Sequence, residues 1–175
     1  MNDVAALAEG DARARENALD ITQSWLVQAP AGSGKTALLI QRFLALLAHV
    51  ERPERIVATT FTRKAAAEMR ERVLAALRAA DDPRAPLPQA QHARIERSLA
   101  QAALAQDRRL GWGITEQPQR LRIVTIDALA AAIARQAPIA AGLGALPGFV
   151  DDAQILYRDA ARAALERAAA EDPHW

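Results

Sequence analysis

The sequence predicts an α/β fold in which helices pack around a parallel sheet, and three observations point to it. Three short apolar runs have the composition of buried strands, at residues 24–28, 56–60 and 121–126. A segment with helical spacing of apolar residues follows each run, as right-handed crossovers between parallel strands require. The connection between the second and third runs is about 60 residues long, which is too long for one ordinary crossover. We therefore expect a helical excursion at about 81–119.

The first expected element is an Ala-rich helix at residues 4–19. The first strand follows it and ends at a segment that contains proline and glycine, residues 29–34. Helical spacing then predicts a helix from Lys35 to about residue 48, through its apolar positions Leu38, Leu39, Phe43, Leu46 and Leu47. Pro53 stops this helix in a charged turn, and β-branched residues after the turn form the second strand.

Capping residues place the helices that follow the second and third strands. Thr62 is the predicted N-cap of a helix at 63–80, and Asp127 that of a helix at 128–135. Between these helices, three prolines predict a loop at 81–88, followed by a helix at 89–105 and an irregular segment at 111–118. The last residues predict a loop at 137–148 and a helix at 151–170.

The composition excludes several classes of protein. The 175 residues suffice for one domain, or for one domain and part of another. The chain has no cysteine, which excludes a disulfide framework, a thiolate metal site and a cysteine nucleophile. No apolar run approaches the roughly 18 residues that cross a membrane, and residues 1–9 carry acids but no base, unlike a secretory signal. We therefore expect a cytoplasmic protein without a membrane partner.

The near-neutral net charge hides a strong preference among the cations. Of the 22 basic residues only Lys35 and Lys64 are lysine, and the other 20 are arginine. A GC-rich genome explains the preference itself. Where arginine is the default, however, a lysine marks a place that favours a compact ammonium over a planar guanidinium.

Lys35 lies in a phosphate-binding pattern. The pattern has alanine in place of its first glycine and comprises Ala29, Pro30, Ala31, Gly32, Ser33, Gly34, Lys35 and Thr36. Small residues let the backbone curl so that its N–H groups face phosphate oxygens, and the following helix adds positive charge at its N-terminus. Lys35 would reach the β- and γ-phosphates of ATP, and the Thr36 hydroxyl would ligate Mg²⁺. We therefore predict Lys35 and Thr36 as catalytic residues.

Three segments in order resemble superfamily 1 DNA helicases of the UvrD-like family. Residues 29–36 resemble their first motif, residues 60–72 their motif Ia, and residues 125–129 the motif that usually reads Thr-Ile/Phe-His. Residues 27–32 and 112–129 are most similar to the RecB/AddA branch, which couples a helicase to a nuclease. The resemblance extends from Asp11 to the end of the chain. It implies a RecA-like lobe that binds ATP, DNA as substrate, and a possible partner subunit of a helicase–nuclease complex.

The resemblance also implies which residues contact single-stranded DNA, and these are Thr60, Phe61, Thr62, Arg63, Lys64 and Thr125. Hydroxyl groups and helix N-termini can donate to phosphates, and Arg63 and Lys64 add positive charge. Phe61 has two open interpretations, a stacking platform for a base or an apolar anchor beneath the sheet edge. Arg70 and Arg72 are interpreted as a solvated helix face.

The sequence departs from the family pattern at two places. Asp127 stands where many relatives have histidine, and a carboxylate there would repel phosphate, so a capping role is favoured. No clear adenine-reading glutamine motif precedes the first strand, which leaves Gln23 and Gln28 as the candidates.

The catalytic acids of a helicase motor are also missing. Residues 150–154 superficially resemble the Asp-Glu-x-Gln motif that holds Mg²⁺ and activates water, but they follow a poor strand and fit a helix start better. We expect residues 1–136 to be the N-terminal part of lobe 1A and residues 137–175 to be a loop and the truncated start of a helical insertion. The expected function is that of an N-terminal ATP-binding fragment of a helicase acting on single-stranded DNA and duplex ends, inactive alone. The alternatives are a non-enzymatic nucleotide- or DNA-binding remnant and, less favoured by motif Ia, a phosphate-loop kinase.

Overall fold

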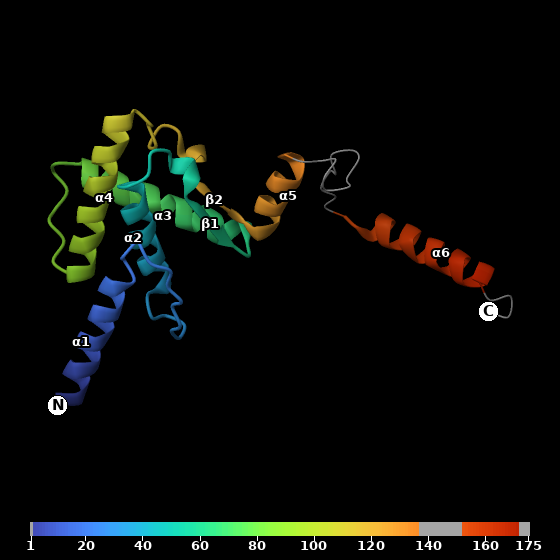
Figure 1. Cartoon of the computed structure of the whole chain (residues 1–175), viewed down its shortest axis with the longest axis horizontal. Coiled ribbons are helices and arrows are strands. Elements are labelled where there is room, and N and C mark those ends of the chain that lie inside the picture. Colours follow the sequence, from blue (N-terminus) through green and yellow to red (C-terminus); the bar gives the residue numbers. More distant parts are fainter. Residues whose placement is uncertain (1, 137–151, 172–175) are drawn as a thin grey trace. The chain divides into compact units, whose positions relative to one another are not determined.

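The computed structural model describes residues 2–136 and 152–171. The chain divides into two compact units, Met1–Ala131 and Ala132–Trp175. The first unit contains α1 (Asn2–Asn17), α2 (Lys35–Leu47), β1 (Val57–Thr60), α3 (Arg63–Asp81), α4 (Gln91–Leu110) and β2 (Arg122–Thr125) (Figure 1). Two short 3₁₀ turns, η1 (Pro53–Arg55) and η2 (Pro118–Arg120), precede the strands. α5 (Ile126–Gln136) crosses the boundary between the units, and α6 (Gln154–Glu171) lies in the second.

The two strands confirm the predicted parallel pairing. Val57 is level with Arg122 and Thr60 with Thr125, so both strands end at the same edge of the sheet. The connection between them carries α3 and α4, which agrees with a helical excursion rather than a single crossover helix. The pairing therefore brings the predicted motif Ia segment and the Thr125 segment together.

The predicted strand at 24–28 is wrong. Residues 24–30 have no regular structure, and among the described residues the sheet consists of β1 and β2. Leu26 is 94% exposed, and Trp25 and Val27 are also exposed. A strand needs a hydrogen-bonding neighbour, and this run has the composition of a strand without one.

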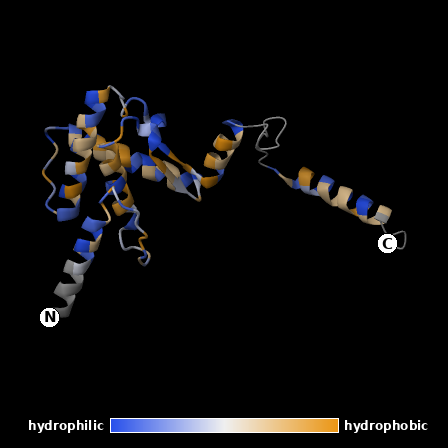
Figure 2. Ribbon diagram, viewed as in Figure 1, coloured by the Kyte–Doolittle hydropathy of each residue, from blue (hydrophilic) through white to orange (hydrophobic). Residues whose placement is uncertain are grey.

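A single apolar core lies where α2, α3 and α4 meet the sheet, and the orange residues of Figure 2 gather there. α4 packs against both α2 and α3. The largest fully buried side chains belong to this region: Ile40, Leu44, Leu47, Val73, Leu77, Ile114, Leu121 and Ile123. Burying them stabilises the unit by about 1.5–3 kcal/mol for each large side chain. This core supports the helix that follows the predicted phosphate loop.

The helix ends differ from prediction in ways that local chemistry explains. The Thr62 hydroxyl accepts a hydrogen bond from the Ala65 N–H at 3.1 Å, which confirms the predicted N-cap of α3. The Asp127 cap is wrong: α5 begins one residue earlier, and the Thr125 hydroxyl accepts from the Ala128 N–H at 3.1 Å. Asp127 therefore lies in the first turn, where its negative charge still favours the helix dipole.

Two further helices shift their bounds. α4 extends to Leu110, five residues beyond the predicted end, and stops where Gly111 adopts a left-handed φ of 64°. α6 begins at Gln154 rather than 151, because the Asp152 carboxylate accepts from the Gln154 N–H and so precedes the helix. Asp152 is thus at a helix start, as predicted for that acid. The predicted loop at 137–148 lies outside the described residues.

The predicted solvated face of α3 is correct for Arg72 and wrong for Arg70. Arg72 is exposed, whereas Arg70 is half-buried and its Nη2 donates to the Ile123 carbonyl of β2 at 2.6 Å. The guanidinium therefore ties α3 to the sheet beside the carboxyl end of β2.

Candidate functional site

The loop at residues 29–36 has the backbone curl that the phosphate-binding pattern requires. Gly32 has a φ of 77° and Gly34 a φ of 84°, a left-handed conformation that side chains disfavour. The Ser33 N–H donates to the Pro30 carbonyl at 3.4 Å and closes the turn. Glycines are therefore needed at these two positions for a conformational reason.

The loop opens directly into α2. Gly34 is the N-cap and makes no side-chain hydrogen bond to the helix, and the first turn contains no acidic residue. The N–H groups of the first turn therefore keep their capacity for an anion, and no carboxylate cancels the partial positive charge of the helix terminus. Thr36 is exposed in this first turn, with its hydroxyl beside the same terminus.

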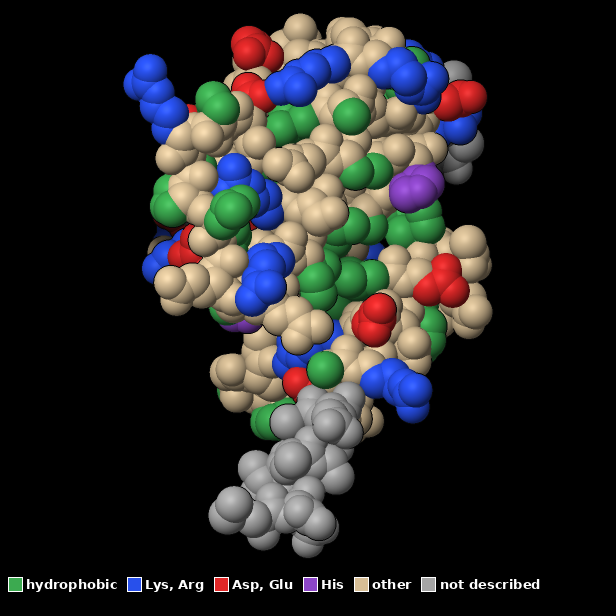
Figure 3. All heavy atoms as spheres, turned by 90° about the vertical axis from the view of Figure 1, so that its left-hand side faces the viewer, with side chains coloured by type: hydrophobic (Ala, Val, Ile, Leu, Met, Phe, Trp, Pro, Cys, Tyr) green, Lys and Arg blue, Asp and Glu red, His purple; other side chains and the backbone are tan. Residues whose placement is uncertain are grey.

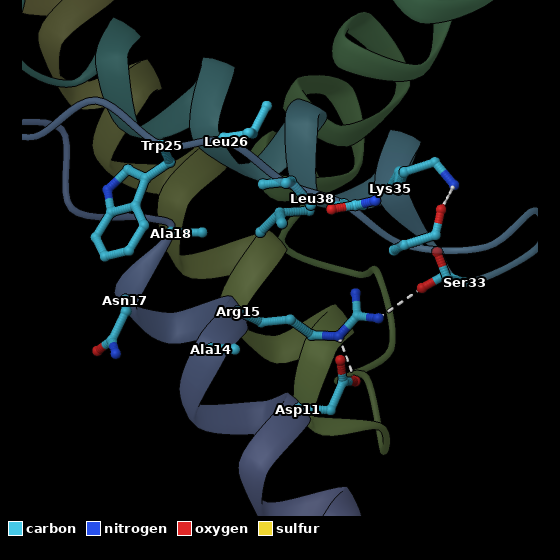
Figure 4. A pocket seen from close by; sticks show the side chains of 13 residues that line it. Asp11, Ala14, Arg15, Asn17, Ala18, Trp25, Leu26, Ser33, Lys35 and Leu38 are labelled. Atoms are coloured by element: carbon cyan, nitrogen blue, oxygen red, sulfur yellow. Dashed lines mark hydrogen bonds and ion pairs between the residues drawn. The ribbon is translucent and has the colours of Figure 1, made fainter.

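Lys35 points back along the loop. Its Nζ donates to the carbonyls of Ala29 and Pro30, both at 2.6 Å, and the side chain is half-buried (Figure 4). An ammonium has three N–H donors, so one remains for an anionic oxygen. The lysine can in this way hold the start of the loop and contact a phosphate from the same position.

A cavity of about 320 Å³ adjoins the loop. Its walls come from α1, from the irregular segment at 25–29 and from Ser33, Lys35 and Leu38 (Figure 4). The volume lies in the range of small-molecule sites. Of the two candidate glutamines, Gln28 lines this cavity, while Gln23 does not.

Arg42 of α2 holds the turn between α1 and this segment, a role that was not predicted from the sequence. Its Nη1 donates to the carbonyls of Ala18 and Asp20 at 2.6 and 2.8 Å, and its Nη2 to that of Gln23 at 2.7 Å. Thr22 donates its hydroxyl and N–H to the Asp20 carboxylate, which lowers the pKa of Asp20. The signal was visible as an arginine on the otherwise apolar α2, because a cation there needs several acceptors.

The second predicted region, the DNA-contact residues, lies at the carboxyl edge of the sheet. Thr60 and Thr125 are register partners there, and Phe61 and Thr62 follow β1 directly. Phe61 is 89% exposed, which excludes the interpretation as a core anchor. Arg63 is exposed, and so is Lys64, whose Nζ lies 3.9 Å from Glu68 Oε1.

The three threonine hydroxyls at this edge are not equivalent. The Thr60 hydroxyl donates to the Thr62 carbonyl at 2.9 Å, so its proton is already used. Thr62 and Thr125 accept hydrogen bonds from helix N–H groups, which leaves each hydroxyl proton available to an outside acceptor. A phosphate oxygen at this edge would therefore be met by Thr62 and Thr125 rather than by Thr60.

The wider surface carries mixed charge. On the face drawn in Figure 3, basic side chains lie among acidic ones rather than in one continuous patch. Within residues 2–136 and 152–171, no group of three or more histidines and carboxylates could hold a metal ion, and no helix is long and apolar enough to cross a membrane. Any anion binding must therefore come from local donors.

The comparison with known families agrees with the order of these segments. Residues 11–172 match the family model of the UvrD/REP helicase N-terminal domain. The chain belongs to this helicase family. The match covers both the loop at 29–36 and the sheet edge, as the resemblance of the sequence to UvrD-like helicases implied.

Curated relatives of this helicase chain are named as one subunit of an ATP-dependent helicase/nuclease. The protein from Anoxybacillus flavithermus is 45% identical over 84 residues, which are 46% of this chain and 7% of that protein. The protein from Desulfitobacterium hafniense is 43% identical over 94 residues, 52% of this chain and 6% of that protein. The aligned part thus spans less than a tenth of either relative. No solved structure gives a significant match.

Proposed function

We propose that this chain is the N-terminal ATP-binding portion of a RecB/AddA-like DNA helicase. The observation that carries the proposal is the loop at 29–36, where two left-handed glycines and Lys35 open into an uncapped helix terminus, in a chain of the helicase family. This arrangement offers backbone N–H groups and an ammonium to the same anion. The triphosphate of ATP is the anion that such a loop suits in this family.

The chain's own oxygens also suit Mg²⁺ bound together with ATP. Thr36 offers a hard hydroxyl oxygen at the helix terminus, and phosphates and water supply the other ligands that this ion prefers. Bound Mg²⁺ would neutralise charge on the phosphates. The residues 29–34 curl around the β-phosphate, Lys35 reaches the β- and γ-phosphates, and Thr36 orients the metal.

We propose a RecA-like arrangement in which residues 1–136 are the N-terminal part of lobe 1A and residues 137–175 begin a helical insertion. The parallel pairing of β1 with β2 and the presence of α4 within their connection support it. The boundary between compact units after Ala131 lies close to the proposed one. The excursion at 81–119 then corresponds to α4 and the turns around it.

Single-stranded DNA, at duplex ends, is the proposed partner of the sheet edge. The exposed Phe61 can stack on a base, while Thr62, Thr125, Arg63 and Lys64 contact the phosphate backbone. The names of the relatives support a second partner, another subunit of a cytoplasmic helicase–nuclease complex that acts in recombination and repair.

We propose that the chain alone binds Mg·ATP without turning it over. Within the described residues, β1 and β2 end in threonine, and neither strand carries the acidic pair that would activate water. Binding and hydrolysis therefore separate in this chain. The non-enzymatic remnant makes the same prediction for the chain alone and differs only in what the longer protein does.

Two lysine variants test the proposal because each controls for the other. Lys35→Ala should abolish ATP binding in a calorimetric titration and leave the affinity for fluorescent oligo-dT unchanged. Lys64→Ala should do the reverse, weakening oligo-dT binding and leaving ATP binding unchanged. ATP binding that survives Lys35→Ala would contradict the proposed site, and robust DNA-stimulated hydrolysis abolished by Lys35→Ala would contradict the proposed inactivity.

A further inference from the structure

An arginine of α1 reaches the loop at 29–36 from outside the sequence motif. Arg15 lies one helical turn after Asp11, and its Nε donates to Asp11 Oδ2 at 2.7 Å. Its Nη2 donates to the Ser33 carbonyl at 2.5 Å, 18 residues further along the chain. Figure 4 shows Arg15 between Asp11 and Ser33, so the guanidinium connects α1 to the loop.

This contact controls the direction of one peptide group. In a trans peptide the carbonyl and the following N–H point in opposite directions. Because Arg15 holds the Ser33 carbonyl, the Gly34 N–H must point away from α1. Gly34 is also the N-cap of α2, so this N–H lies at the start of the helix terminus that would bind phosphate.

The closeness of the guanidinium adds a second constraint on the same peptide. A Cβ placed on Gly34 would lie 3.3 Å from Arg15 Nη1, tighter than most side-chain contacts. Gly32 has the same left-handed conformation, but a Cβ there would meet nothing within 4 Å. Arg15 therefore covers one side of Gly34 in particular, and the peptide cannot turn toward α1 without displacing it.

The charge of Arg15 is largely compensated. Asp11 accepts directly from its Nε, so the pair contributes little net positive charge to the loop. Its effect on an anion must come mainly from geometry. We infer that Arg15 is a positioning residue for phosphate, which aims the Gly34 N–H by holding the Ser33 carbonyl; this rests on the proposed nucleotide binding at 29–36.

The test compares Arg15→Ala with Arg13→Ala in the full chain. Arg13 is an exposed arginine on the same helix, so its substitution makes the same change of charge and helix propensity. Mg·ATP and Mg·pyrophosphate are titrated into ¹⁵N-labelled protein, and the Gly34 amide signal is followed. Arg15→Ala should weaken both ligands about five- to tenfold, the effect of about one hydrogen bond, and reduce the response of the Gly34 amide. Arg13→Ala should bind both ligands as the wild type does.

Asp11→Ala supplies a second variant. It should weaken pyrophosphate by less than Arg15→Ala, because Arg15 keeps its bond to Ser33 but loses its support. In the Arg15→Ala background, Asp11→Ala should have no further effect, since both residues act through one contact. Thermal unfolding of each variant checks that the fold is intact.

Several results would overturn the inference. A loss confined to ATP would mean that Arg15 serves the adjoining cavity rather than the phosphates. A loss that shrinks steeply with added salt would mean direct charge attraction to the ligand. Equal binding by Arg15→Ala and Arg13→Ala would remove the positioning role while the proposed function stands, provided that Lys35→Ala still abolishes binding. If Lys35→Ala binds both ligands as the wild type does, the proposed nucleotide site fails and the inference fails with it.

Discussion

The bond between Arg70 and β2 predicts a measurable loss of stability in Arg70→Ala. The guanidinium donates to the Ile123 carbonyl at 2.6 Å and is half-buried between α3 and the sheet. Ile123 itself is fully buried in the core. Removing Arg70 would therefore leave a strand carbonyl without this donor and leave a gap where the side-chain stem had packed.

The size of the loss follows from these contacts. A hydrogen bond to a charged group contributes about 1.5–3 kcal/mol. Because Arg70 is only half-buried, water can reach part of the site, and we expect a loss of about 2 kcal/mol. For a chain of this length, that corresponds to a fall of about 4–8 °C in Tm.

Chemical denaturation with urea, followed by circular dichroism, measures the change. Arg72→Ala is the matched control, because Arg72 lies on the same helix, loses the same side chain and is exposed. It should change the free energy of unfolding by less than about 0.5 kcal/mol. The reasoning would be refuted if Arg70→Ala and Arg72→Ala had the same free energy of unfolding.

Three further predictions concern other parts of the first unit. Gly34→Ala should destabilise the loop by about 1–2 kcal/mol because of its left-handed φ, whereas Gly10→Ala, in the interior of α1 with free space around it, should stabilise the helix by about 0.5–1 kcal/mol; urea denaturation compares the two, and equal effects would contradict the expected strain. A hydrogen bond from Arg120 holds the pKa of Glu54 below its ordinary value of 4.5, so this pair stabilises the fold above that pH and loses its effect as the pH falls through the lowered pKa. Glu54→Gln should therefore show a weaker dependence of Tm on pH below 4.5, and an unchanged dependence would exclude the pair as its cause. Phe61→Ala should weaken oligo-dT binding by about 1–3 kcal/mol in fluorescence anisotropy without changing the urea midpoint, because the ring is 89% exposed; a lower midpoint with unchanged DNA affinity would make it a structural residue.

Local chemistry was enough to predict most helices and both paired strands. The Thr62 cap, the prolines after α3 and the β-branched residues of β1 act over a few residues, and each appears in the structure at or near its predicted place. The curl of the loop at 29–36 could be predicted for the same reason, since Gly32 and Gly34 supply the required backbone conformation themselves. The capping of α5 could not be separated so finely, because Thr125 and Asp127 are both good caps.

Partners that are distant in sequence explain the errors. The run around Leu26 has the residues of a strand, but pairing depends on a neighbour that the run does not contain, and none of the described residues pairs with it. Arg70 has the spacing of a solvated position, and only the folding of β2 against α3, 53 residues away, makes it a connecting residue. Arg15 was missed because nothing in residues 11–15 indicates a contact with Ser33.

The sequence by itself determined the family, the location of the candidate phosphate loop and the order of the DNA-contact segments. These depend on residue types at fixed spacing, and short-range backbone preferences are enough to express them. Only the tertiary structure decided that Thr60 and Thr125 lie side by side, that Phe61 faces solvent, and that Arg15 holds the Ser33 carbonyl. Each of these facts depends on which long-range contacts bury the most apolar surface while satisfying the buried polar groups, and that balance is settled by the chain as a whole.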